Sequence, residues 1–261
     1  MKQFLQQLTS IITFIIILMS FHNTSLALAQ SGSIRFNPPP PPADRGAPGN
    51  RGEGASRGEC TQPGIPLTAL VPSYEQQLNQ GTETVTVTQV WALTSTEQPS
   101  FWFYIPYQKS SIKAVEFVLQ TEKNTTISRK NITVPPIPGI VRVQLQNQET
   151  ILATNKPYHW FFKVRVVCDS QQATTLNYVE GWVQRVNLDV SLRQQLKQSS
   201  PRQQAAIYAK NGIWYDALTS LAELRLTNLQ DSQLIEDWEN LLKVIKLEKL
   251  ATKPLIGTNF K

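Results

Sequence analysis

Residues 67–186 alternate between apolar and polar side chains, and this period of two constrains the fold more than any other feature of the sequence. In residues 83–93, Val85 and Val87 fall on one face of an extended chain and Thr86 falls on the other. The pattern predicts eight strands, at residues 67–71, 83–93, 101–105, 112–121, 125–134, 139–146, 158–168 and 176–186. Short strands with frequent turns are typical of an antiparallel β-sandwich, immunoglobulin-like or jelly-roll-like. Because nothing between them suggests a helical crossover, we expect no parallel sheet.

We place the sandwich at residues 65–190 and a C-terminal helical segment at residues 191–261. After Asn187 the apolar period lengthens to 3.6 residues, which predicts helices. Pro201 suits a first helical turn, because its missing amide would have no partner there. Asp231 or the next residue caps a later helix.

The helical segment also carries a repeat-like pattern. Small and aromatic residues fall at tetratricopeptide spacings at Ala205, Tyr208, Gly212, Trp214, Ala217 and Leu221. The segment resembles one tetratricopeptide hairpin, although Leu224 stands where a small residue is usual and no proline follows. A solenoid needs several repeats, so we expect this single hairpin to pack on the sandwich. If the helices instead dock a partner, the candidate residues are Tyr208, Trp214 and Trp238.

Aromatic residues cluster at residues 101–107 and 158–162. Neighbours in a strand point to opposite faces, so both faces of the sheet carry aromatic side chains. One face is core. The other is either covered by the C-terminal helices, which we favour, or exposed as a platform for a sugar ring or an apolar partner. The candidate platform residues are Trp102, Tyr104, Tyr107 and Trp160.

Residues 1–29 predict a secretory signal peptide. Lys2 precedes an apolar run that is too short to span a bilayer, and Ala27 and Ala29 supply the small residues for cleavage before Gln30. The alternative is a retained amphipathic anchor. We expect a mature protein in the periplasm or at the cell surface, with no transmembrane segment after cleavage.

Residues 30–64 are rich in proline, glycine and arginine and predict a disordered linker. A proline-rich docking peptide and an arginine-glycine segment for anionic polymers are the alternatives. The G-x-S-x-G pattern around Ser56 matches a nucleophile elbow in letters only. That elbow needs a strand before it and a helix after it, followed by an acid and a histidine. No aspartate separates Ser56 from His159, the one histidine left after signal cleavage, so we discard this motif.

Two cysteines, Cys60 and Cys168, remain in the mature chain. Thiols outside the cytoplasm tend to oxidise, so we expect a disulfide between them. Such a loop stabilises by about 4–5 kcal/mol in the chain-entropy model. Two free buried thiols and intermolecular pairing are the alternatives. Two cysteines and one histidine make a metal site improbable, and no cofactor motif is present.

The net charge is +6, and it falls to +5 when Lys2 leaves with the signal peptide. This modest excess does not indicate a nucleic-acid partner, whereas an anionic surface or glycan fits it as well. The sequence has no phosphate loop and no zinc-protease motif. Glu116 and Glu180 are the candidates for a carboxylate pair, which would make the protein a carbohydrate-active hydrolase.

Several short motifs occur in a fixed order, among them PSFWFYIP at residues 99–106, KPYHW at 156–160, VEGWV at 179–183 and WYDAL at 214–218. Through these motifs nearly the whole mature chain resembles the cyanobacterial family catalogued as domain of unknown function 928. The resemblance implies an envelope protein without an assigned activity, so no catalytic residue is carried over. The sequence predicts a non-catalytic binding or structural module that engages an envelope protein or a polysaccharide. A structural envelope protein whose linker docks to a larger assembly is a further alternative.

Overall fold

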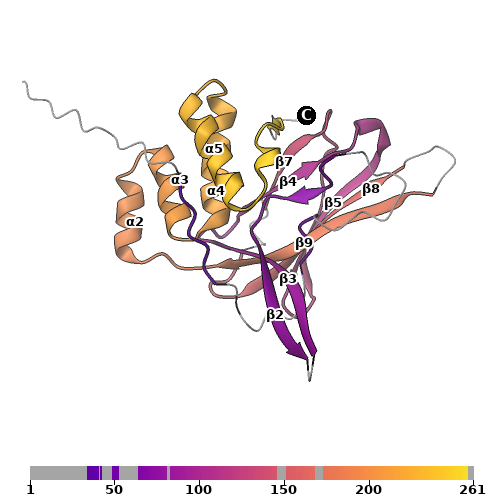
Figure 1. Ribbon diagram of the computed structural model, residues 1–261, viewed down its shortest axis with the longest axis horizontal. Helices are drawn as coiled ribbons and strands as arrows, with labels where there is room; N and C mark the ends of the chain where they lie inside the picture. The colour runs from indigo at the N-terminus through magenta and orange to yellow at the C-terminus, as the bar shows by residue number, and fades with distance from the viewer. Residues whose placement is uncertain are drawn as a thin grey trace, which may run out of the picture. The chain divides into compact units, whose positions relative to one another are not determined.

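The computed structural model describes residues 34–40, 42, 49–52, 64–80, 83–145, 151–167 and 173–257, which form two β-sheets and a group of C-terminal helices (Figure 1). Residues 1–29, Ser56, Cys60 and Cys168 lie outside the described residues. The signal peptide and the disulfide therefore stay predictions.

The larger sheet has the strand order β2-β3-β9-β8-β5-β6 and the smaller sheet the order β1-β4-β7-β10. The strands of the larger sheet are β2 (Ser73–Gln80), β3 (Glu83–Thr94), β5 (Ile112–Thr121), β6 (Thr126–Asn131), β8 (Pro157–Val166) and β9 (Thr175–Arg185). Those of the smaller sheet are β1 (Thr68–Ala69), β4 (Ser100–Ile105), β7 (Gly139–Gln144) and β10 (Leu255–Ile256). Two 3₁₀ turns follow β4 and the last helix, at Lys109–Ser111 and Glu248–Leu250. The prediction of a mainly β fold with C-terminal helices is confirmed.

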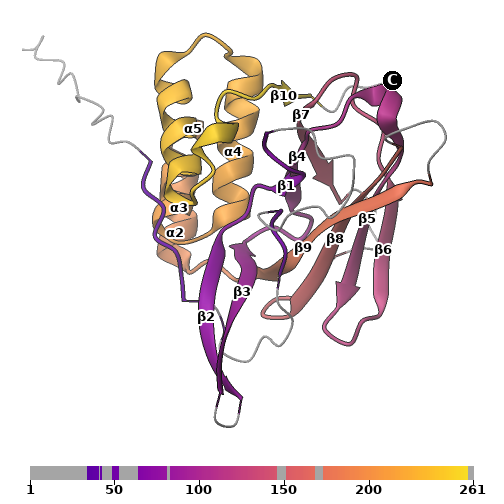
Figure 2. The same ribbon diagram turned by 45° about the vertical axis from the view of Figure 1, so that its right-hand side comes forward.

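Both sheets are mixed, which corrects the expectation that all strands are antiparallel. In the larger sheet β3 runs parallel to β9, with Trp91 opposite Trp182. In the smaller sheet β10 runs parallel to β7. Neither pair is a single strand–helix–strand unit, because the chain between β3 and β9 forms five other strands and the chain between β7 and β10 includes β8, β9 and the C-terminal helices. The β2–β3 hairpin extends beyond the other strands (Figure 2); β2 was not predicted, because its glutamine-rich sequence lacks an apolar alternation.

The core between the sheets is built from aromatic rings on the inward positions of three strands. Phe103 of β4 stacks on Phe162 of β8, with ring centroids 4.0 Å apart and planes 2° apart. Phe101 of β4 contacts Phe117 of β5 at 4.8 Å. Trp160 completes the cluster against Phe103 at 5.5 Å. The alternation read from the sequence therefore has a direct packing consequence, since one face of each strand fills the space between the sheets.

The helices are α2 (Val190–Lys197), α3 (Pro201–Lys210), α4 (Trp214–Thr227) and α5 (Ser232–Val244). Ser200 and Gln203 form a reciprocal capping box at the start of α3, and Pro201 occupies its first turn. Asp231 caps α5 by accepting from the backbone N–H groups of Gln233 and Leu234. Within the described part of the chain, none of these helices is both long and apolar enough to cross a bilayer.

Three consecutive residues at the start of α4 join the helices to the sheets. The indole Nε1 of Trp214 donates to the carbonyl oxygen of Leu70 at 2.8 Å. The Tyr215 hydroxyl accepts from Trp160 Nε1 at 2.8 Å. The Asp216 carboxylate accepts from Thr94 Oγ1 at 2.7 Å. Because these three residues at the start of α4 are buried, the helix completes the core of the β domain instead of lying on its surface.

Two parts of the expected linker pack on the folded domain, which corrects the prediction that all of residues 30–64 are disordered. The first lies against the α3–α4 hairpin, where the backbone N–H of Asn37 donates to the carbonyl of Ala209 at 3.1 Å. Phe36 meets Trp214 edge to face, with centroids 4.8 Å apart. The apolar side chain at position 36 thus has a buried partner that local composition does not reveal.

The second part, residues 49–52, threads between the sheets. Asn50 and Glu180 exchange both backbone hydrogen bonds, as neighbours in a β-ladder do. Arg51 is only 3% exposed, and its Nη1 donates to the carbonyls of Ile245 at 2.7 Å and Val71 at 3.3 Å. Gly52 has a φ of +108°, a conformation that favours glycine. Arg51 therefore ties the end of α5 to the β domain.

Candidate functional site

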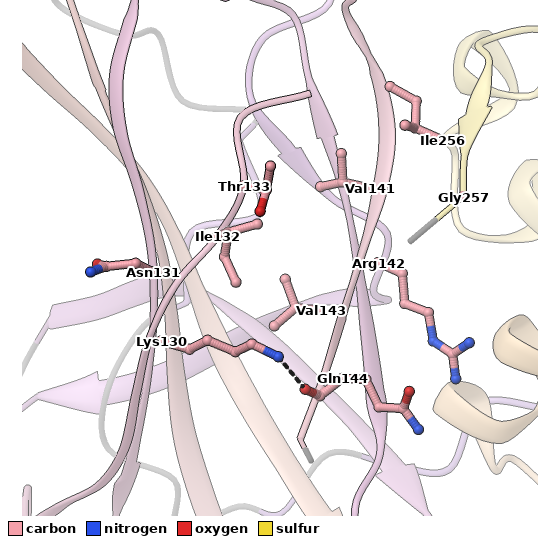
Figure 3. Close-up of a pocket in the computed structure, with 10 residues that line it drawn as sticks. All are labelled: Lys130, Asn131, Ile132, Thr133, Val141, Arg142, Val143, Gln144, Ile256 and Gly257. Carbon is pink, nitrogen blue, oxygen red and sulfur yellow. Dashed lines mark hydrogen bonds between the residues drawn. The ribbon is translucent and has the colours of Figure 1, made fainter. Parts of the chain in front are cut away.

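A groove of about 160 Å³ opens at one seam of the sandwich, between β6 at the edge of the larger sheet and β7 of the smaller sheet (Figure 3). We call it the seam groove; it is lined by Lys130, Asn131, Ile132, Thr133, Val141, Arg142, Val143, Gln144, Ile256 and Gly257. Figure 3 shows Ile132 and Val143 around one common space, with Lys130 reaching across its lower end. The groove therefore combines an apolar floor with a cationic end.

The alternation of β7 explains the floor. Val141 lies opposite Phe103 of β4, and Val143 lies opposite Phe101, so both valines face the core between the sheets. Arg142 points to the other face, where its Nη1 lies 2.8 Å from Oε1 of Glu223 on α4 and its Nε donates to Ser100 Oγ at 2.8 Å. The charge of Arg142 is thus already balanced on the helix side.

Lys130 supplies the positive charge within the seam groove. Its Nζ donates to the carbonyl oxygen of Gln144 at 3.3 Å and so bridges β6 and β7. The side chain is half-buried, and none of the ten lining residues is Asp or Glu. A carboxylate placed here would meet a cation in a partly desolvated site, where charge-assisted hydrogen bonds are stronger than in water.

The backbone edge of β7 is the third element of the seam groove. The N–H of Ile140 donates to the carbonyl of Pro254 at 2.8 Å, so the even-numbered residues of β7 direct their backbone groups toward this edge. β10 ends at Ile256, opposite Val141. Within the described residues, no strand pairs with the rest of this edge, which runs from the carbonyl group of Arg142 to Gln144.

A second, larger pocket of about 340 Å³ lies where the N-terminal segment, the base of the β2–β3 hairpin and the end of α5 meet. Arg51 and Tyr74 line it, and burial lowers the pKa of Arg51 to about 10 and raises that of Tyr74 to about 12. Arg51 already donates hydrogen bonds to two backbone carbonyls in this pocket, so we assign the pocket a structural role. The seam groove is therefore the candidate functional site.

The four candidate platform residues are all buried, so none of them offers an exposed stacking face. Trp102 lies under α4, where its Nε1 donates to Thr219 Oγ1 at 3.0 Å. Tyr104 lies beneath the ammonium group of Lys253, and burial raises the pKa of Tyr107 to about 12. Trp160 is part of the core between the sheets. The helices thus cover the aromatic face of β4, the alternative that we favoured.

The three candidate docking residues of the helices differ in how deeply their side chains are buried. Trp214 and Trp238 are fully buried, and Tyr208 is half-buried. A partner could reach Trp214 only by separating α4 from the β domain, and Trp238 only by separating α5 from Arg225 of α4. This corrects the assignment of the two tryptophans as docking residues, because neither side chain is exposed, whereas the assignment of Tyr208 stays a prediction.

Glu116 and Glu180 lie on one face of the larger sheet, on the two strands that flank β8. Glu116 Oε1 is 2.6 Å from Arg129 Nη1, whereas Glu180 Oε2 is 3.0 Å from His159 Nε2. Two strand spacings and an offset of two residues along β8 put their backbones about 12 Å apart. His159 is 6% exposed and stacks on Trp182 at 4.4 Å. The structure therefore brings the two carboxylates to one sheet face but gives each its own cationic or imidazole partner.

Within the described residues, no group of three or more His, Cys, Asp or Glu side chains could hold a metal ion.

Sequence reasoning missed the seam groove. The strand pattern of residues 139–146 alternates Arg142 with Val141 and Val143, which is a local signal for a cation on one face of a strand. It carried no information that Lys130 would reach Gln144, because that contact joins the edges of two different sheets.

These observations define a class of protein: a β-sandwich closed on one side by a buried helical hairpin and open at one seam. The chain belongs to the family described as Domain of Unknown Function (DUF928), whose model matches residues 52–255. No curated protein matches the chain. The match confirms the family resemblance inferred from the motifs, whereas the cyanobacterial source and the likeness to a tetratricopeptide hairpin stay predictions.

Proposed function

We propose that this protein is a non-catalytic binding module outside the cytoplasm, in the periplasm or at the cell surface, and that the seam groove holds a segment of an envelope protein. The observation that carries the proposal is the combination, in one groove, of an apolar floor, Lys130 and a strand edge that no described residue pairs with. Such a combination of a pocket with backbone donors and acceptors is a common way to bind an extended chain.

A protein segment fits the seam groove better than a polysaccharide does. Sugar rings are held by stacking on aromatic faces, and none of the ten lining residues is aromatic. The aromatic residues that could have provided such a face are buried under α4 or between the sheets. The signal-like residues 1–29 and the two cysteines support a location outside the cytoplasm.

The proposal is tested by site-specific photo-crosslinking of the full mature chain in native envelope extracts. A photoreactive residue at Thr133, on the exposed rim of the groove, is compared with one at Leu229, which is 65% exposed in the loop before α5. We expect a defined adduct from position 133 that protease digests, and none from position 229. The adduct should weaken when Lys130→Glu is added.

Two results would overturn the proposal. An adduct that resists protease but is cleaved by periodate would make the partner a polysaccharide. Equal adducts from both positions would mean that the seam groove has no special affinity. Lys130→Glu removes the hydrogen bond to the Gln144 carbonyl, so its free energy of unfolding should fall by about 1–3 kcal/mol. A cooperative urea transition and a native circular dichroism spectrum for this variant separate lost binding from lost folding.

A further inference from the structure

We infer that the partner segment binds as an added β-strand on β7, with an apolar side chain in the seam groove and an acidic side chain beside Lys130, two residues further along. This inference rests on the proposed function and adds the chemistry of the partner. It follows from three features of the groove: the direction of β10, the volume above the valines and the position of Lys130.

The edge of β7 already accepts a strand from this chain. β10 pairs in parallel with Ile140 and Val141 and then ends. A segment that continues this line in the same direction would meet the backbone groups of Arg142 and Gln144, which point to the same edge as those of Ile140. Lys130 Nζ now occupies the carbonyl of Gln144 and would turn toward the incoming chain.

The apolar position follows from the pleat. Residues opposite each other in a ladder point to the same face, so the incoming residue opposite Val143 faces the groove floor. The groove volume of about 160 Å³ is close to that of a cavity of about 150 Å³ that accommodates a benzene ring. One side chain the size of leucine, methionine or phenylalanine would fill it.

The acidic position follows from the same alternation. Two residues further along, the incoming side chain again points to the inner face, near the end of β7 where Lys130 meets Gln144. The intervening side chain points to the helix face, where Glu223 already pairs with Arg142. The site therefore selects an apolar residue, any residue and then Asp or Glu.

The test is selection of a random peptide library on the full mature chain and on two charge-reversal variants. Lys130→Glu reverses the groove cation. Arg129→Glu makes the same change on the preceding residue of β6, whose exposed side chain points to the opposite face and pairs with Glu116. The wild type and Arg129→Glu should enrich the apolar-x-acid pattern. A synthetic peptide with this pattern should bind Lys130→Glu about tenfold more weakly, a change set by one charge-assisted contact.

The outcomes separate this inference from the proposed function. Peptides that block the crosslink from position 133 but show no acidic preference would overturn the inferred pattern and leave the groove as a binding site. If no enriched peptide blocks that crosslink, both claims fall. A chain ending at Gly257 provides the last arm: a rise of about tenfold or more in its peptide affinity would assign the groove to the chain's own last four residues and overturn the partner. An unchanged affinity supports a partner segment.

Discussion

The helix-covered side of the β domain and the seam groove are built from the same alternating strands, yet they use polar groups in opposite ways. At the helix joint, Trp214, Tyr215 and Asp216 each find a hydrogen-bond partner on a different part of the sheets. At the seam, the edge of β7 beyond Val141 has no paired strand among the described residues, and Lys130 caps one carbonyl. Buried polar groups that all have hydrogen-bond partners stabilise one fold. An apolar floor beside a strand edge with unpaired backbone groups can instead bind a further chain.

Removing the helices that carry the joint should change the stability of the β domain more than any single substitution. A chain that ends at Gln198 lacks α3, α4 and α5 and leaves the Leu70 carbonyl and the Trp160 indole without their partners. We expect it to lose cooperative unfolding in urea and its near-ultraviolet circular dichroism. A chain that ends at Gly257 is the control and should unfold like the full mature chain. A cooperative transition in the short chain would show that the sandwich is autonomous and that the helices are only a cover.

The sequence predicts only those features of the helix joint and of the seam groove that depend on local pattern. Alternation located most strands, and Pro201 and Asp231 marked helix starts through local effects that span three residues or fewer. It missed the contacts between distant segments. Arg51 finds its partner 194 residues away at Ile245, so a composition typical of a linker concealed a buried side chain. The seam groove was hidden for the same reason, because strand patterns do not say which edges of two sheets come together.

Tyr215 gives the second test, a single hydroxyl at the centre of the joint. Tyr215→Phe keeps the ring but leaves the buried Nε1 of Trp160 without its acceptor. We expect the free energy of unfolding to fall by about 1–3 kcal/mol, the usual cost of an unpaired buried polar group. The matched control is Tyr178→Phe on β9, where the side chain is 45% exposed and the change should stay below about 0.5 kcal/mol. Equal losses in urea unfolding for the two variants would mean that the Tyr215 hydroxyl does not hold the joint.

The smallest effect is the pH dependence that Asp216 gives to the joint. Burial raises the pKa of Asp216 above its ordinary value of 3.8, although Ser95 and Thr94 donate to the carboxylate. A raised pKa means that the folded protein holds this proton more tightly than the unfolded chain does. The stability contributed is therefore fully present below the ordinary pKa and is lost as the pH rises through the raised value.

Asp189 supplies a control of opposite sign. It caps α2 from an exposed position, and hydrogen bonds from Leu192 and Ser191 lower its pKa below 3.8. Its contribution is present above the ordinary pKa and is lost as the pH falls through the lowered value. Between about pH 7 and about pH 4, the wild type should thus gain stability relative to Asp216→Asn as the pH falls. Relative to Asp189→Asn it should lose stability over the same change, with most of the loss at the acidic end. Urea unfolding of the three proteins at a series of pH values measures both slopes. If the two differences change in the same direction, Asp216 is not a desolvated carboxylate, and the joint is more open to water than its hydrogen bonds imply.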